Sequence, residues 1–181
     1  MQADDNLFSG YEKLAEKAGK VAERLGKLHN QHMECRLGCS FCCMDYSIFP
    51  VEYYAILSKV KETEVRFNPS EAPDECVFLV NNACMIYAHR PVICRTHGLP
   101  LLYTNEEGEW EMSACELNFT SFEDDFHAKN TFPQDRFNSD LFMLNKEFVN
   151  RKEYSHFSEF DLLPLRSMKD ELLLARERQK P

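Results

Sequence analysis

The chain begins with a long amphipathic pattern. Between residues 7 and 33, apolar side chains recur at spacings of four and three, which places them on one face of an α-helix. The set comprises Leu7, Tyr11, Leu14, Ala18, Val21, Leu25 and Leu28. Such a stripe could pair with another chain, but Gly19 and Gly26 weaken this helix as a zipper. We therefore predict a helix over 7–33 that packs against the rest of its own chain.

The middle of the chain shows shorter periods. Pro50 is well placed to begin a second helix over 50–62, because proline suits the first helical position. Apolar runs at 77–80 and 83–87 flank Asn81 and Asn82, and asparagine tolerates the left-handed backbone of a tight turn. They predict a β-hairpin. A helical turn is predicted at 91–95, and a second hairpin from 101–104 to 109–113.

Beyond residue 115 the chain is rich in phenylalanine and returns to helical spacing. Helices are predicted over 136–151 and 164–179. A length of 181 residues suits one domain. The pattern thus predicts an α+β, mainly helical fold in a single domain over 1–181. This domain comprises the N-terminal helix at 7–33, a small loop-and-hairpin core at 35–115, and a Phe-rich helical part at 116–181 that helps to wrap that core.

The charge balance removes two classes of partner. Thirty acidic against 21 basic side chains give a formal net charge of −9. Nucleic acids and anionic membranes need a basic face, so we expect neither as a partner. No apolar run approaches the ~18 residues of a membrane span. Residues 1–6 lack the basic start and apolar stretch of a secretory signal, so we expect a cytoplasmic protein.

Cysteine is the residue whose abundance changes this picture. There are eight, and four of them fall in one short run at 35–43. The full set is Cys35, Cys39, Cys42, Cys43, Cys76, Cys84, Cys94 and Cys115. Cytosolic thiols are kept reduced, so we favour metal ligation, with four disulfides as the alternative. Short spacings let a turn aim several sulfurs at one point, as in zinc and iron–sulfur sites.

The order of these residues resembles a known family. The run C-x3-C-x2-C-C at 35–43, Cys76, the segment CMIYAHRPVICR at 84–95 and finally Cys115 resemble the YkgJ-type, or CxxCxxCC, cysteine-cluster family. The resemblance implies a zinc- or iron-chelating domain over about 35–115, with all eight cysteines as metal ligands. Flagellin lysine N-methylases resemble the same core distantly, and for them the implied cofactor is an iron–sulfur cluster.

The spacing also bears on the metal. Eight thiolates can make two Cys₄ zinc sites, or one four-cysteine cluster with four cysteines in other roles. Zinc sites commonly show paired C-x₂-C knuckles, and only Cys39 and Cys42 have that spacing here. We therefore predict a [4Fe–4S] cluster or iron, with zinc as the alternative. The run also matches a radical-SAM triad, but a barrel scaffold takes ~200 residues or more.

Four side chains near the later cysteines are candidates for supporting or substrate-binding roles. Arg90 and Arg95 could donate hydrogen bonds to sulfides, offset negative charge or hold an anionic substrate. Ion pairs with acidic neighbours are the alternative for both. His97 could replace a ligand or carry protons, and Tyr87 could pack over the site and keep it dry.

The predicted function is accordingly a metal-binding protein with a redox, electron-transfer or iron–sulfur enzyme role. Its partners would be the metal ion or cluster and a protein substrate or redox partner. The alternatives are an interaction module in which zinc is structural, and a protein that buffers or delivers the metal. The sequence carries no signature of a catalytic residue and leaves open whether the protein is an enzyme.

Overall fold

The structure is a computed structural model that describes residues 7–70 and 72–178; the expectation about residues 1–6 concerns a part of the chain outside these ranges. The α+β, mainly helical prediction is confirmed. The described residues form the helices α1 (Ser9–Leu28), α2 (Pro50–Val60), α3 (Val92–Thr96), α4 (Gln134–Val149) and α5 (Ser167–Arg178). Short 3₁₀ turns occur at Asn30–His32, Tyr87–His89 and Lys152–Tyr154. None of the described helices has the length and apolar character needed to cross a membrane.

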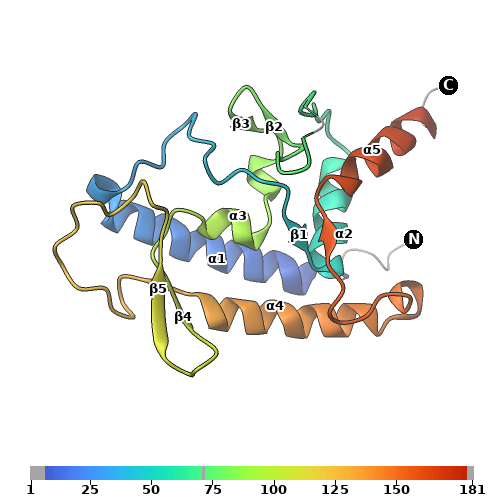
Figure 1. Ribbon diagram of the computed structural model, residues 1–181. Coiled ribbons are helices and arrows are strands. Elements are labelled where there is room, and N and C mark those ends of the chain that lie inside the picture. Colours follow the sequence, from blue (N-terminus) through green and yellow to red (C-terminus); the bar gives the residue numbers. More distant parts are fainter. Residues whose placement is uncertain (1–6, 71, 179–181) are drawn as a thin grey trace.

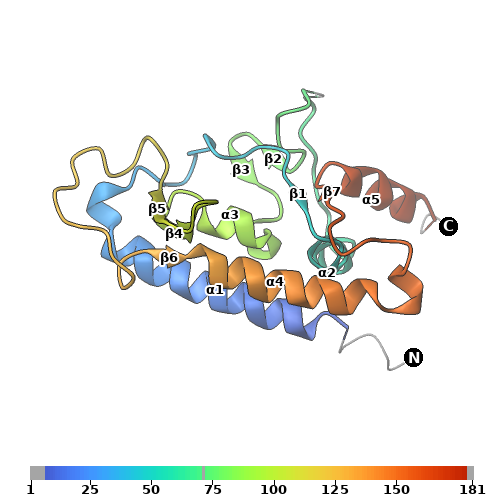
Figure 2. The same ribbon diagram turned by 60° about the horizontal axis from the view of Figure 1, so that its bottom comes forward.

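Helices α1 and α4 lie side by side and run in opposite directions (Figures 1 and 2). The stripe of α1 supplies much of the buried surface, since Tyr11, Leu14, Ala18 and Leu25 are all buried. Only its end leaves the core, where Leu28 is 55% exposed. The stripe therefore packs against its own chain, as predicted, although the helix ends at Leu28 and a 3₁₀ turn follows.

Helix α2 connects the α1–α4 pair to α5. Most of its residues are buried, and it contacts α1, α4 and α5. A fully buried amide holds its first turn: Asn145 accepts a hydrogen bond from the backbone N–H of Val51 (3.2 Å) and donates one to the carbonyl of Glu159 (3.0 Å). One side chain thereby joins α2, α4 and the segment that follows α4.

Both predicted hairpins are present. Strands β2 (Leu79–Val80) and β3 (Ala83–Cys84) pair across Asn81 and Asn82, whose φ angles are 52° and 58°. Strands β4 (Leu101–Thr104) and β5 (Trp110–Ser113) pair antiparallel, and β6 (Phe132–Pro133) adds in parallel to β4. Strands β1 (Ser47–Ile48) and β7 (Leu163–Pro164) form a further pair. Two-residue strands such as β1, β6 and β7 are too short to show alternation, and the sequence pattern did not predict them.

The cysteine-bearing segments lie together on one side of the α1–α4 pair. Figure 2 shows α3, the β2–β3 hairpin and the segment between α1 and β1 above these two helices. Helix α3 contacts α1 directly, while α2 and α5 stand at one end of the cysteine-bearing layer (Figure 1). Helices α1 and α4 therefore lie beneath the cysteine-bearing layer, and α2 and α5 border it at one end.

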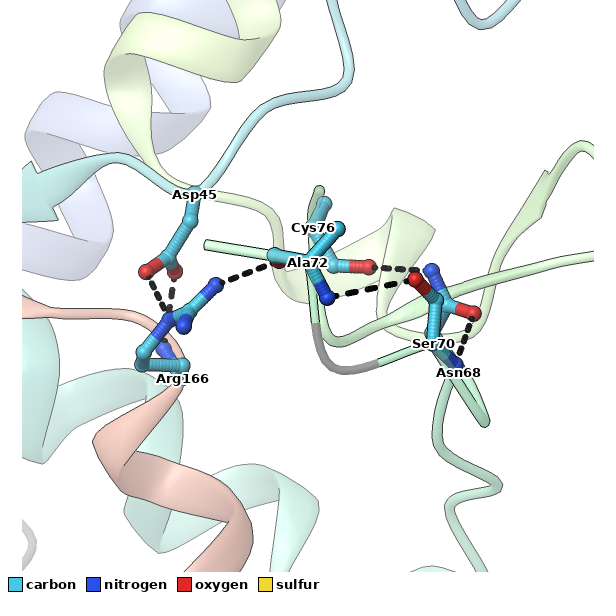
Figure 3. A network of polar contacts seen from close by, with 6 residues as sticks. All are labelled: Asp45, Asn68, Ser70, Ala72, Cys76 and Arg166. Atoms are coloured by element: carbon cyan, nitrogen blue, oxygen red, sulfur yellow. Dashed lines mark hydrogen bonds and ion pairs between the residues drawn. The ribbon is translucent and has the colours of Figure 1, made fainter. Parts of the chain in front are cut away.

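A polar network fixes part of this layer to the C-terminal segment (Figure 3). Arg166 donates through its Nε and its backbone N–H to Asp45, whose side chain is only 7% exposed. Its Nη2 donates to the carbonyl of Ala72 (3.0 Å). Farther along the same loop, Asn68 donates to the carbonyl of Cys76 (3.4 Å). Arg166 therefore holds together two loops that each lead to or from a cysteine.

A buried carboxylate joins the other helices. Glu52 of α2 is 2% exposed and accepts hydrogen bonds from the Tyr11 hydroxyl of α1 (3.0 Å) and the Val92 N–H of α3 (2.6 Å). Burial raises the pKa of Glu52 to about 7, although both hydrogen bonds favour the ionised form. The protonation of this carboxyl therefore affects the contact of three helices.

We predict that Glu52 makes folding stability fall as the pH rises. Below the ordinary pKa of 4.5 the carboxyl is protonated in both the folded and the unfolded chain. Between 4.5 and about 7 the unfolded chain releases the proton first, so the folded state is progressively disfavoured. Glu52→Gln keeps an acceptor for both donors and does not titrate. Between about pH 5 and about pH 8, the free energy of unfolding of Glu52→Gln should rise by up to roughly 3 kcal/mol relative to that of the wild type, as measured by urea unfolding. A stability difference that stays constant with pH would contradict this.

A second prediction concerns the Arg166–Asp45 pair. Arg166→Met keeps much of the side-chain stem but leaves the buried carboxylate of Asp45 without its counter-charge. Because Arg166 itself is partly exposed, we expect a loss of roughly 2 kcal/mol, below the full cost for a buried pair. Urea unfolding measures it, with the exposed Arg151→Met as the matched control. Adding Asp45→Asn to Arg166→Met should recover part of the loss, and no recovery would mean that the pair is not the cause.

Candidate metal centre

All eight cysteines lie within the described ranges, and all are free thiols. The loop between α1 and β1 carries four of them, and four later segments each carry one. These are Cys76 before β2, Cys84 in β3, Cys94 in α3 and Cys115 after β5. Cys35 and Cys39 are exposed, Cys76 is buried and the others are intermediate. The thiols thus range from the surface of this layer to its interior.

Three other thiols lie within charge range of Cys35. Burial raises the pKa of Cys35, and the neighbouring Cys39, Cys42 and Cys115 raise it further, because a thiolate at one position disfavours a second close by. We call these four cysteines the Cys35 group. It brings three residues of the 35–43 loop together with one that follows β5.

An asparagine and a glycine hold this group together. The side chain of Asn118 donates to Cys35 Sγ (3.3 Å) and to the Gly98 carbonyl (2.7 Å), and it accepts from the Glu34 N–H (2.7 Å). Its backbone N–H donates to the Cys115 carbonyl (2.9 Å). At Gly98, where φ is +88°, an added Cβ would lie 2.4 Å from Cys35 Sγ. This approach of backbone to sulfur therefore requires glycine.

The remaining thiols surround Cys43. Those of Cys76, Cys84 and Cys94 all lie close enough for their charges to act on it, and burial raises the pKa of each of the three. We call these four the Cys76 group. Backbone pairing brings its members together, because Met44 and Glu75, the neighbours of Cys43 and Cys76, form an antiparallel bridge. Cys84 lies opposite Leu79 in the hairpin that follows Cys76.

The two groups adjoin at one peptide bond. A hydrogen bond from the Cys42 thiol lowers the pKa of Cys43 and raises that of Cys42. Tyr46 lies beside this junction: its hydroxyl donates to the Cys42 carbonyl (3.1 Å), and its ring stacks on His97 with centroids 4.9 Å apart. Burial raises the pKa of Tyr46 to about 12, and nearby cysteines of both groups add to the rise. One stacked pair of rings therefore borders both groups.

Of the four predicted supporting residues, Arg90 adjoins the thiols and His97 stacks on Tyr46. The charge of Arg90 opposes the rise that burial causes in the pKa of Cys84 and Cys94, and its Nε is buried with no hydrogen-bond partner among the described residues. Burial lowers the pKa of His97. Its Nε2 is also buried and has no hydrogen-bond partner in the described ranges. The guanidinium of Arg90 rests 4.0 Å from the ring of Tyr87, which is 62% exposed.

Arg95 faces a different part of the molecule. It lines a cleft of about 370 Å³ whose walls include Tyr11 and Lys59. Its Nη2 donates to the Ala88 carbonyl (3.1 Å), while its Nε is buried and finds no acceptor among the residues described. A supporting role for Arg95 at the metal stays a prediction. Glu12 and Glu16 also line this cleft, and Glu12 pairs with Lys59 (2.8 Å), so the charge of its lining is mixed.

The thiols do not yet stand in a coordination geometry. Among the described residues, no three His, Cys, Asp or Glu side chains are arranged so that they could hold a metal ion. The sulfurs of each group would therefore have to approach one another on binding. The donor chemistry nonetheless fits a thiolate-bound metal, since a cation would relieve the repulsion within each group and sulfurs would accept from the unpartnered N–H donors.

Sequence reasoning missed Asn118, Gly98 and Tyr46. Asn118 follows Cys115 by three residues, and nothing in its spacing separates it from any polar loop residue. Gly98 carries a weak signal, since a glycine soon after a cysteine-bearing helical turn often marks a close backbone approach. Nothing in the sequence distinguishes Tyr46 from the other aromatic residues. Their roles arise from contacts between distant segments.

We predict that Asn118→Asp destabilises the Cys35 group. The substitution removes the donor to Cys35 and to the Gly98 carbonyl and places a carboxylate against both. Because the site is buried, we expect a loss of roughly 2–3 kcal/mol in urea unfolding. Asn138→Asp, on an exposed position of α4, is the matched control and should change stability little. An equal effect of the two substitutions would refute the role given to Asn118.

Comparison with known proteins bears on the same segment. Residues 34–116 match the family model CxxCxxCC, described as "Putative zinc- or iron-chelating domain". No curated protein and no solved structure matches the chain significantly. The matched range includes every cysteine of the sequence and ends just before Asn118. Residues 34–116, a little under half of this chain, are thus similar to the CxxCxxCC family.

Proposed function

We propose that this protein holds an iron–sulfur cluster, or iron, through its clustered cysteines and acts in redox chemistry or electron transfer. Metal chelation is supported by the family model that residues 34–116 match. The observation that carries the proposal is that eight free thiols from five segments lie within range of one another's charges, in two adjoining groups. Metal identity and redox role go beyond that family description.

The first step of the argument concerns charge. Burial holds the pKa of Cys35, Cys76, Cys84 and Cys94 above the ordinary value of 9.0, and neighbouring thiolates add to the rise at all of them except Cys84. These thiols are therefore protonated near neutral pH. A bound cation reverses this preference, because metal ligation replaces the proton on each sulfur. Without a cation the protonated thiols carry no charge, and a bound positive centre would compensate the thiolates that form when the protons leave.

The second step concerns the surroundings of the sulfurs. Arg90 offers a buried Nε–H without a partner in the described chain, and its charge acts on nearby thiols. His97 has a buried ring nitrogen, Nε2, that is likewise without a partner there, and its ring stacks on Tyr46. Hydrogen bonds to cluster sulfurs and nearby positive charge are the protein's means of tuning reduction potential. When bound, an iron–sulfur cluster would supply one-electron transfer. In this chain Arg90 would offset its negative charge, and the Tyr46–His97 stack would exclude water.

The third step concerns access. Cys35 and Cys39 are exposed, so the Cys35 group reaches the surface while Cys76 remains buried. A redox partner or protein substrate would approach at the 35–43 loop. Reduced thiols persist in the cytoplasm, which we propose as the location.

A structural zinc module is the second candidate function. The observation that favours it is the division of the thiols into fours, since a structural zinc ion takes four ligands. In that case the metal would stabilise the loops and the helices would carry the partner surface.

Purification under anaerobic conditions should separate the two candidates. We expect a brown protein with broad absorption near about 400 nm, iron and acid-labile sulfide in similar amounts, and bleaching in air. A colourless protein with stoichiometric zinc and no redox response would overturn the iron–sulfur proposal in favour of the structural one. Cys42→Ala should lower both metal content and solubility, because metal binding contributes to folding. Ser40→Ala, in the same loop, is the matched control and should retain both.

A further inference from the structure

We infer that the eight cysteines form two separate metal sites, one from the Cys35 group and one from the Cys76 group, with the boundary between Cys42 and Cys43. This inference rests on the proposed function, in that it takes the cysteines to bind metal. It goes further by assigning each ligand to a site and by excluding a single four-cysteine centre with four spare thiols.

Backbone and side-chain contacts tie the Cys35 group together independently of its charges. Asn118 connects Cys35 with the turn that begins at Cys115. Its side chain donates to the Cys35 sulfur, and its backbone N–H donates to the Cys115 carbonyl. The backbone of Gly98 also lies close to the Cys35 sulfur. Residues 36–43 then turn back on themselves, through hydrogen bonds from Cys39 to Arg36 and from Cys43 to Ser40. These contacts lie at the end of the layer formed by the loops after α1 and after β5.

A different set of contacts ties the Cys76 group together. The Met44–Glu75 bridge aligns the chain after Cys43 with the chain before Cys76. Arg166 joins the same two segments through its hydrogen bonds to Asp45 and to the Ala72 carbonyl (Figure 3). The hairpin then returns Cys84 toward Cys76, through the hydrogen bond from the Leu79 N–H to the Cys76 carbonyl and the Leu79–Cys84 pairing.

The boundary follows from the local backbone. Cys42 lies within the turn at 40–43, whereas Cys43 is the last residue of that turn and leads into the extended segment that pairs with Glu75. The chain therefore leaves one group and enters the other between these residues. Their side chains belong to different local structures, even though the Cys42 thiol donates a hydrogen bond to Cys43.

The numbers of ligands agree with this division. Four thiolates complete a tetrahedral zinc site, and four also ligate a [4Fe–4S] cluster. A single centre of four ligands would leave four of these cysteines without a metal. Two centres use all eight, one in each set of contacts described above.

Titration with Co²⁺ under anaerobic conditions tests the inference on the full, reduced chain. Thiolate-bound Co²⁺ absorbs through ligand-to-metal charge transfer, and we expect saturation at about two ions per chain. The double variants Cys35→Ser/Cys115→Ser and Cys76→Ser/Cys84→Ser should each retain about one ion and about half of the absorption. Saturation of the wild type at one ion would overturn the inference and leave the proposed metal binding intact. Binding of no Co²⁺, Zn²⁺ or iron would overturn both.

A second measurement avoids the risk that a variant fails to fold. The wild-type protein loaded with Co²⁺ is treated with increasing chelator and a thiol-alkylating reagent, and the labelled cysteines are located by fragment mass spectrometry. We expect the thiols to become reactive in two sets, with Cys42 labelled together with Cys35 and Cys43 labelled together with Cys76. Simultaneous labelling of Cys42 and Cys43 with all the others would overturn the division.

Discussion

Repulsion among closely placed thiolates is the constraint on which the rest of this structure depends. A sulfur that is removed from water disfavours its ionised form, and each neighbouring thiolate increases that cost. The chain opposes it with local donors: Asn118 on Cys35, Arg90 near Cys84 and Cys94, and the Cys42 thiol on Cys43. These donors are too few to compensate eight thiolates, so without a positive centre most of the thiols stay protonated.

The helical part of the molecule then serves to keep weakly structured segments in place. The cysteine-bearing layer contains turns, two-residue strands and one helix of five residues, none of which is stable alone. Arg166 and Glu52 attach it to the helices by polar contacts that are largely buried. Because such contacts are directional, they fix the positions of the loops more narrowly than apolar packing would. Preorganised loops reduce the entropy lost when sulfurs close on a metal.

The sequence allowed the elements to be predicted where a repeat is long enough to be seen. The stripe from Tyr11 to Leu25, the Pro50 start of α2 and the asparagine turn of the first hairpin all follow from local rules, and all are confirmed. The pairing of β1 with β7 could not be foreseen, since it joins residues more than a hundred positions apart through two-residue strands. The set of cysteines was likewise recognisable from spacing. Their division into groups depends on non-local contacts such as Met44–Glu75, which no spacing encodes.

The contacts of Asn118 and Arg166 come from outside the segment that matches the family model. Recognisable similarity ends at residue 116, yet the amide that braces Cys35 and the guanidinium that clamps the loop before Cys76 both come from later in the chain. The matched segment is thus smaller than the set of residues that hold its cysteines in place. A fragment trimmed to the motif would keep every sulfur and lose the braces that orient them, so chain flanking such a motif can be as much a part of the site as its ligands.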